Sequence, residues 1–329
     1  MDGQQSRNYS AFDFGLWEAN LTPRSTLSGK PWNRASADIP EEIYQPKGML
    51  GGEERRALFW LTDKYYEGQG FIIDAGAYVG ASAFCLASGL ARRQDLPLKT
   101  PTIFSYDYFE AIDSYVVSQL SNDFGSCQVG DNYFDIFQLQ TKKYQHLIRA
   151  IPGDFLRQHW DASPIEILFI DVAKTRELNS HIVSEFFPYL IPGRSLVIQQ
   201  DFYHCWHPYI HVTMEFFKEY FDIIDRRIDV ASRLYFYKKK IPDYAIEAIA
   251  SYRISSAQRL AFLDRYVGSE TGDDQAMAKV VRLRQLVEDQ EWKAAKNAYR
   301  EITEDYRAEN NEKPWRIQAE QVASSLVGK

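Results

Sequence analysis

One segment in the first third of the chain, GFIIDAGAYVGASAF at residues 70–84, constrains the fold more than any other. Phe71–Ile73 form a short apolar run that ends at Asp74, as expected for a strand buried on both faces of a parallel sheet. Gly76 and Gly80 then bracket a turn, and small residues open a predicted helix. A helix N-terminus carries unpaired N–H groups and partial positive charge, and glycines let an anionic ligand approach it. The segment therefore predicts a doubly wound, Rossmann-like α/β fold with a nucleotide-type cofactor at the carboxyl edge of its sheet.

Acidic residues recur where further strands are predicted to end. Apolar, β-branched runs over 102–107, 165–171 and 195–201 each stop at an acid, and a shorter segment over 151–155 carries another. These acids are Asp107, Asp171, Asp201 and Asp154. Strands alternate with predicted helices up to a predicted terminal hairpin over 221–229 and 234–240. Right-handed crossovers bring the strand ends to one edge of the sheet, so we expect the acids to gather there.

The glycine turn also indicates which cofactor is bound. Gly76-Ala77-Tyr78-Val79-Gly80 lacks the middle glycine of the dinucleotide fingerprint G-x-G-x-x-G. An acid two positions before the first glycine instead resembles motif I of class I S-adenosylmethionine-dependent methyltransferases. The resemblance implies that Asp74 lies near the methionine amino group, Asp107 at the ribose hydroxyls and Asp154 at the adenine amino group. It implies cofactor contacts for the remaining members of the set as well: Gly76, Ala77, Tyr78, Gly80, Ser82 and Asp171.

Within that superfamily, residues 48–240 are most similar to sugar O-methyltransferases of the macrocin O-methyltransferase type. Those enzymes hold magnesium with an acid after the fourth strand and an acidic pair after the fifth, which correspond here to Asp171, Gln200 and Asp201. Their general base is a histidine where this chain has Lys174. Gln200 replaces an acid, so the resemblance implies a weaker magnesium site. Lys174 can act as the catalytic base only if its pKa falls well below about 10.4, and the bland alternative is an ion pair with Asp171 or Glu177.

A histidine-rich segment after the fifth predicted strand offers other chemistry. Residues 201–211 contain Asp201, His204, His207 and His211 together with four aromatic side chains. His204 is a candidate general base because an imidazole titrates near neutral pH. Asp201, His204 and His207 are alternatively candidate ligands of zinc or iron. A third interpretation is that the segment packs as a wall of the acceptor pocket and binds no metal.

Composition excludes several classes of function. The net charge of −7, from 38 basic and 45 acidic residues, argues against nucleic acid as a partner. No run reaches the roughly 18 apolar residues of a membrane span, so no membrane partner is expected. The three cysteines are scattered through the sequence, which is typical of a reducing compartment and favours a cytoplasmic protein.

Three regions are predicted: an N-terminal arm over 1–47 that covers the site, a methyltransferase domain over 48–242 and a helical extension over 243–329. One helix pair over 280–305 resembles a single tetratricopeptide-type unit, which cannot bury itself, so we expect a homo-oligomer. The predicted function is S-adenosylmethionine-dependent O-methylation of a small-molecule acceptor, with a sugar or glycosylated intermediate favoured. The alternatives are a methyltransferase-like binding or scaffold protein without catalysis, and a nicotinamide-dependent oxidoreductase.

Overall fold

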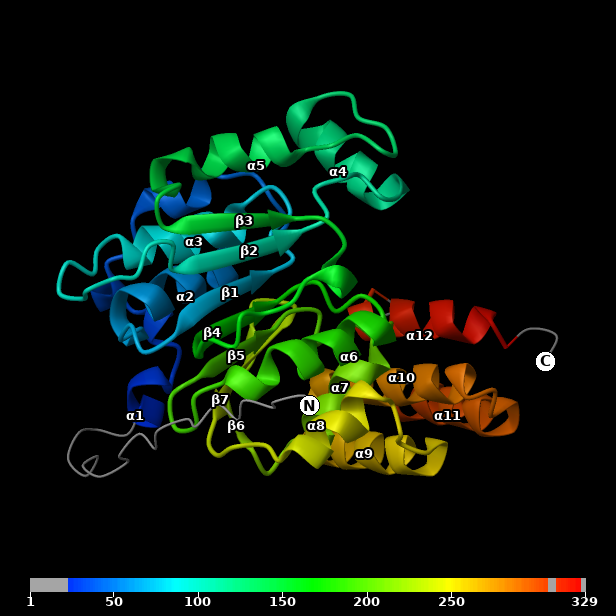
Figure 1. Ribbon diagram of the computed structural model, residues 1–329. Coiled ribbons are helices and arrows are strands. Elements are labelled where there is room, and N and C mark those ends of the chain that lie inside the picture. Colours follow the sequence, from blue (N-terminus) through cyan, green and yellow to red (C-terminus); the bar gives the residue numbers. More distant parts are fainter. Residues whose placement is uncertain (1–22, 307–311, 327–329) are drawn as a thin grey trace, which may run out of the picture.

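A computed structural model describes residues 23–306 and 312–326 of the chain. Its centre is one seven-stranded sheet with the strand order β3-β2-β1-β4-β5-β7-β6 (Figure 1). The strands are β1 (Phe71–Ala75), β2 (Ile103–Asp107), β3 (Ile148–Pro152), β4 (Ile165–Ile170), β5 (Leu196–Gln199), β6 (Phe221–Ile228) and β7 (Ser232–Tyr237). The first five run parallel, and β7 pairs antiparallel with both β5 and β6. The order reverses between β1 and β4, which is where open α/β sheets bind ligands. The predicted α/β sheet is therefore confirmed.

Helices cover both faces of this sheet. The α-helices of the described residues are α1 (Pro23–Leu27), α2 (Gly52–Trp60), α3 (Ala81–Leu90), α4 (Ser114–Phe124), α5 (Phe134–Thr141), α6 (Arg176–Glu185), α7 (Pro208–Phe216), α8 (Asp243–Ala250), α9 (Ser256–Ser269), α10 (Gly272–Glu288), α11 (Trp292–Asp305) and α12 (Pro314–Ser324). Successive strand side chains point to opposite faces, so Ile72 packs with α2 and α3 whereas Ile73 packs with α6 and α7. In the described ranges, no helix combines the length and the apolar character that crossing a bilayer requires.

The described part of the N-terminal arm lies against α2. Trp32 is fully buried, and its indole N–H donates to Glu53 Oε1 at 3.2 Å. Gly48, just beyond the arm, reaches the start of α3, where a Cβ added to it would lie 2.9 Å from Ala81 Cβ. Residues 1–22 of the predicted arm lie outside the described residues.

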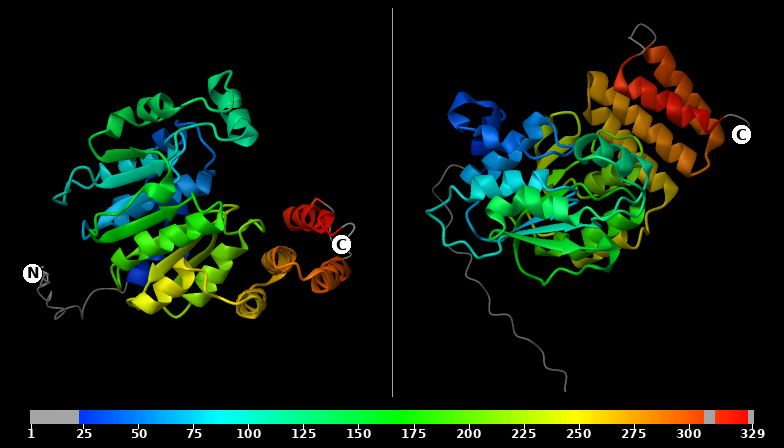
Figure 2. Two further views of the ribbon diagram at one scale, coloured as in Figure 1. Left: turned by 45° about the vertical axis from the view of Figure 1, so that its right-hand side comes forward. Right: turned by 90° about the horizontal axis from the view of Figure 1, so that it is seen from above.

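The C-terminal helices form a layer of their own, on the side toward which the arrowheads of β1, β2 and β3 point (Figures 1 and 2). The predicted helix pair over 280–305 corresponds to the end of α10 and to α11, and α10 begins earlier, at Gly272. The segment after β5 touches this layer. The Cys205 N–H donates to Gln318 Oε1 of α12 at 2.9 Å, and the Arg284 guanidinium of α10 lies 5.2 Å from the Trp206 ring centroid. The extension therefore supports the loop that carries the candidate histidines.

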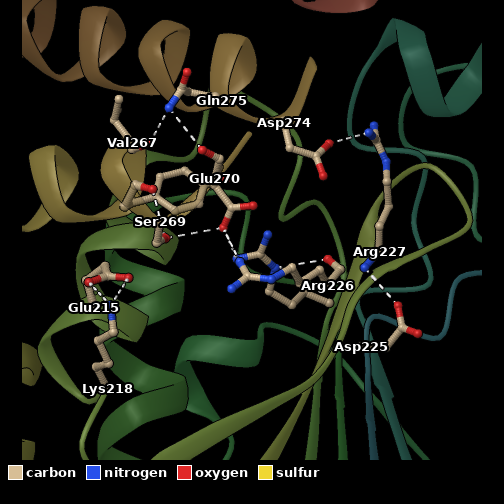
Figure 3. A network of polar contacts seen from close by, with 12 residues as sticks. Glu215, Lys218, Asp225, Arg226, Arg227, Val267, Ser269, Glu270, Asp274 and Gln275 are labelled. Atoms are coloured by element: carbon tan, nitrogen blue, oxygen red, sulfur yellow. Dashed lines mark hydrogen bonds and ion pairs between the residues drawn. The ribbon is translucent and has the colours of Figure 1, made fainter. Parts of the chain in front are cut away.

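A buried ionic network fastens the C-terminal layer to the hairpin of β6 and β7 (Figure 3). Glu270, between α9 and α10, accepts from Arg226 Nη1 at 2.8 Å and from Arg233 Nη1 at 3.0 Å. Arg227 Nη1 donates to Asp274 Oδ1 at 2.5 Å. Arg233 and Glu270 are almost fully buried, so losing either partner would leave an uncompensated charge in the interior.

Candidate functional site

Asp74 is the last residue but one of β1 and lies inside the protein. Its side chain is fully buried, and Ser105 Oγ donates to Asp74 Oδ2 at 2.9 Å. The other oxygen, Oδ1, has no hydrogen-bond partner among the described residues. Burial raises the pKa of Asp74 to about 7, and the Ser82 and Ser105 hydroxyls offset this rise only in part. A buried carboxyl with one unsatisfied oxygen is costly for the empty protein, and it is suited to a ligand that brings a positive donor.

The glycine turn after β1 is shaped first by the protein itself. Gly76 and Gly80 have φ angles of 102° and 98°, which strongly favour glycine. A Cβ on Gly76 would lie 2.7 Å from the Asp171 carbonyl carbon, and one on Gly80 would lie 2.8 Å from Thr141 Cγ2. The absence of a side chain at these glycines therefore lets the end of β4 and the helix α5 pack closely against the turn. Sequence reasoning had not predicted this close packing.

The backbone donors of this turn divide into two sets. The N–H groups of Gly76 and Ala77 both donate to the Tyr106 carbonyl oxygen, at 2.9 and 3.0 Å. The Tyr78 N–H donates to Asp107, and the Gly80 N–H donates to the Ala77 carbonyl. In the first turn of α3, by contrast, the N–H groups of residues 81–83 donate to no acceptor in the part of the chain that the structure describes. The Val79 N–H of the turn likewise has no acceptor among the described residues, so the donors left for an anionic group are that N–H and those of the first turn of α3.

Asp107 ends β2 as predicted, but its carboxylate already carries several hydrogen bonds. Oδ2 accepts from the Tyr78 N–H at 2.8 Å. Oδ1 accepts from the Phe109 N–H at 2.8 Å and from the Tyr133 hydroxyl at 2.7 Å. A carboxylate has about four acceptor positions, so little capacity is left for two ribose hydroxyls while Tyr133 is in place. Sequence reasoning missed Tyr133 because it comes from a segment without a motif.

Asp154 follows β3 and acts as a local cap. Its Oδ1 accepts from the Leu156 N–H at 3.0 Å, and Arg157 Nε lies 3.4 Å from its Oδ2. The side chain is 40% exposed, so the carboxylate remains open to a ligand from solvent. The structure places it at the predicted strand end without testing its predicted contact with adenine.

Asp171 and Asp201 come together at the ends of β4 and β5, with Lys174 between them. Lys174 Nζ lies 2.6 Å from Asp171 Oδ1 and also donates to Asp201 Oδ2. The two carboxylates raise the pKa of Lys174 above its ordinary value despite burial. These contacts argue against Lys174 as the general base, because two anions hold the proton that a base must lack, and its catalytic role stays a prediction.

The same contacts leave the predicted magnesium site at Asp171, Gln200 and Asp201 without support. The Lys174 ammonium takes a place that the carboxylate oxygens would have to give to a metal. The described residues contain no group of three or more His, Cys, Asp or Glu side chains arranged to hold a metal ion. Gln200 Oε1 is buried and has no hydrogen-bond partner among those residues, but a single amide oxygen does not restore the site. Asp201, His204 and His207 likewise form no such group among the described residues, so the alternative zinc or iron set is also without support.

The histidines after β5 have different roles. His204 is exposed, and nothing in the structure tests it as a base. His211 is fully buried, where its Nε2 lies 2.6 Å from the Phe202 carbonyl oxygen and burial lowers its pKa to about 3. It therefore braces the loop. His207 is partly buried, and its Nε2 lies 3.9 Å from Asp201 Oδ2.

A hydrogen-bond chain fixes the tautomer of His207. The Tyr209 hydroxyl donates to the Ala173 carbonyl at 3.2 Å, so it accepts from His207 Nδ1, which lies 2.6 Å away. The proton on Nδ1 leaves Nε2 as an acceptor on the side of Asp201. Burial lowers the pKa of His207 to about 4, so its ring is neutral at pH 7. Sequence reasoning considered His207 as a metal ligand or as part of a packed pocket wall, because the Tyr209 contact was not visible to it.

Unfavourable backbone conformations mark the same edge of the sheet. Tyr78, Phe109 and Asp201 follow β1, β2 and β5 and have φ angles of 46°, 55° and 61°. Such conformations cost energy in residues other than glycine and persist where surrounding contacts impose them. They bring the Tyr78 N–H and the Phe109 N–H to Asp107, and they bring the Asp201 carboxylate to Lys174.

A cavity of about 500 Å³ lies elsewhere, lined by residues of the arm and by Trp60, Lys64, Glu67 and Arg194. It is at the amino-terminal side of the strands, where Arg194 pairs with the fully buried Glu166. None of the strand-end acids lines it, so we place the functional site at the carboxyl edge on chemical grounds.

Comparison with known proteins adds little to this description. No protein-family model matches the chain, and no curated protein matches its sequence. Among solved structures it is similar to the O-methyltransferase NovP, with 14% sequence identity and a TM-score of 0.44. The similarity covers 58% of this chain and 82% of that one. A TM-score this low carries no argument, so the assignment of the fold rests on the strand order and the site.

Proposed function

We propose that the protein binds S-adenosylmethionine at the carboxyl edge of its sheet and methylates a hydroxyl of a small molecule. The observation that carries this proposal is the unpaired Oδ1 of Asp74 beside the uncapped first turn of α3. An amino-acid head group has a cation and an anion a few bonds apart. The buried carboxylate matches its ammonium, and the N–H groups of residues 81–83 match its carboxylate.

Asp107 and Asp154 then lie where ribose and adenine would follow, at the ends of β2 and β3. When bound, this cofactor supplies a methyl group made electrophilic by its sulfonium. The protein's remaining task is to orient the acceptor hydroxyl and to take its proton as its oxygen gains the methyl group. His207 Nε2 suits that task better than Lys174, because it is a neutral acceptor held in one tautomer. A sugar or glycosylated intermediate as acceptor is our proposal from the resemblance alone.

A second function, ligand binding without catalysis, is favoured by two observations. Asp107 is largely satisfied by the protein's own donors, and Lys174 is held between two acids instead of acting as a base. A methyltransferase-like binding or scaffold protein would keep the head-group site and lose turnover. Self-association through the C-terminal helices also remains a prediction.

Calorimetric titration of the full chain with S-adenosylmethionine and, separately, with NAD tests the proposal. We expect micromolar binding of S-adenosylmethionine and no binding of NAD, because the turn after β1 lacks the middle glycine of the dinucleotide fingerprint. Magnesium should change neither result, since the Lys174 ammonium already occupies the carboxylate oxygens of Asp171 and Asp201 that a metal would need. If neither nucleotide bound, the cofactor assignment would be lost, and NAD binding would favour an oxidoreductase.

Two substitutions at β2 separate the ribose contact from the local structure. Asp107→Ala should abolish binding of S-adenosylmethionine, since it removes the ribose acceptor and the partner of the Tyr78 N–H. Tyr133→Phe should instead strengthen binding about fivefold, because one hydrogen bond, worth about 1 kcal/mol, becomes available to the ribose. Both affinities are measured by calorimetry, with circular dichroism as the control for folding. Unchanged affinity in a folded Asp107→Ala variant would remove Asp107 from the site.

A further inference from the structure

Three charged side chains from separate parts of the sequence meet at the ends of β4 and β5. Asp171 follows β4, Lys174 stands in the turn before α6, and Asp201 follows β5. Lys174 Nζ lies 2.6 Å from Asp171 Oδ1 and also donates to Asp201 Oδ2. Asp201 makes this contact from a left-handed backbone conformation with a φ of 61°. The ion pair is therefore imposed by the fold and is not a chance surface contact.

The ammonium group has one donor left over. Asp171 and Asp201 accept two of its three N–H groups, and the third finds no acceptor among the residues that the structure describes. The Lys174 side chain is 46% exposed, whereas those of Asp171 and Asp201 are 21% and 14% exposed. The Lys174 ammonium thus faces the solvent as a positive donor, and the two carboxylates that hold it are more deeply buried.

We propose that Lys174 is the resident cation of this site, and that its ammonium takes the place of a divalent metal between Asp171 and Asp201. The carboxylate pair is then closed to metals as long as Lys174 is present. The inference rests on the proposed function and deepens it: Lys174 Nζ and His207 Nε2 both lie near Asp201 Oδ2, and a tethered cation there would position an acceptor oxygen without a metal.

The physical argument rests on competition for the same oxygens. Magnesium and manganese need hard oxygen ligands at about 2 Å in octahedral geometry, and both carboxylates would have to provide them. An ammonium held by the same carboxylates fills that position and repels a second cation. Removing the ammonium while keeping its stem should leave two neighbouring carboxylates without a counter-ion, with the buried Gln200 Oε1 next in sequence to Asp201.

Manganese is the probe for this inference, measured on the full chain by electron paramagnetic resonance and calorimetry. The wild type should bind manganese only weakly at this site, and Lys174→Met should bind it at least about tenfold more tightly, a change of about 1.4 kcal/mol. Lys174→Arg keeps the charge and should behave like the wild type. Lys174→Met combined with Asp201→Asn should lose the gained binding, which assigns the site.

Two results would overturn the proposal. One is equal manganese affinity in the wild type and in Lys174→Met. The other is no gained binding in a Lys174→Met protein whose circular dichroism and thermal unfolding show that it is folded. The titration requires neither S-adenosylmethionine nor an acceptor. Its outcome is therefore independent of whether the proposed methyl transfer occurs.

Discussion

Replacing Asp74 by asparagine is expected to stabilise the unliganded protein at pH 8 and to remove most of its affinity for S-adenosylmethionine. Burial raises the pKa of Asp74 in the folded state to about 7, above the model-peptide value of about 3.9. The folded carboxyl therefore holds its proton more tightly than the unfolded one. Its contribution to stability is complete below about pH 4 and is lost as the pH rises through about 7. Across that range the loss amounts to roughly 4 kcal/mol, at about 1.4 kcal/mol per pH unit.

The asparagine variant should lose this pH dependence, because an amide stays neutral and can keep the Ser105 contact. Urea unfolding at pH 5 and at pH 8 measures the effect. From pH 5 to pH 8, the free energy of unfolding of the variant should rise relative to that of the wild type by roughly 2 to 3 kcal/mol. Asp135→Asn, at an exposed acid in α5, is the control and should leave the pH dependence unchanged. At pH 8 the variant should also bind S-adenosylmethionine at least about tenfold more weakly, because a charge-assisted contact is lost. If the stability of the variant and of the wild type depended equally on pH, the pKa of Asp74 would not be raised in the unliganded protein.

Parts of the fold and site that depend on local sequence could be predicted from it. The apolar run before Asp74, the glycine turn after it and the similar run before Asp171 each specify a buried strand and its end over a few residues. Right-handed crossovers then suffice to bring those ends to one edge. The predicted strand-end acids are accordingly found together at the carboxyl edge of the sheet.

What could not be predicted depends on contacts between distant segments. The Tyr133 hydroxyl reaches Asp107 from 26 positions away, and Lys174 joins Asp201 across 27 positions. The local sequence suggested an ion pair between Lys174 and Asp171, three positions apart, but it did not show that the same ammonium also reaches Asp201, where the magnesium prediction needed a free carboxylate. The C-terminal helices were likewise predicted without the contact of Gln318 to the loop after β5.

Gly76→Ala should destabilise the protein by about 2 to 5 kcal/mol. Two costs add up: a φ of 102° is a conformation that residues with a Cβ rarely adopt, and a Cβ would lie 2.7 Å from the Asp171 carbonyl carbon. A left-handed backbone costs a non-glycine residue about 1–2 kcal/mol, and overpacking costs about 1–3 kcal/mol. The end of β1 and the end of β4 must move apart to make room for the alanine side chain. The strain therefore acts directly on the backbone that carries Asp171. The free energy of unfolding in urea measures the loss.

Gly68→Ala is the matched control, because it shares the positive φ without the crowding. Its φ is 75°, and a Cβ there would meet no atom within 4 Å. It should cost only the backbone part, about 1 to 2 kcal/mol. The difference between the two variants is then the cost of forcing apart the strand ends that hold Asp74 and Asp171. If both variants lost the same stability, the close approach of Gly76 to Asp171 would not be rigid, and the geometry between β1 and β4 would be free to adjust around a ligand.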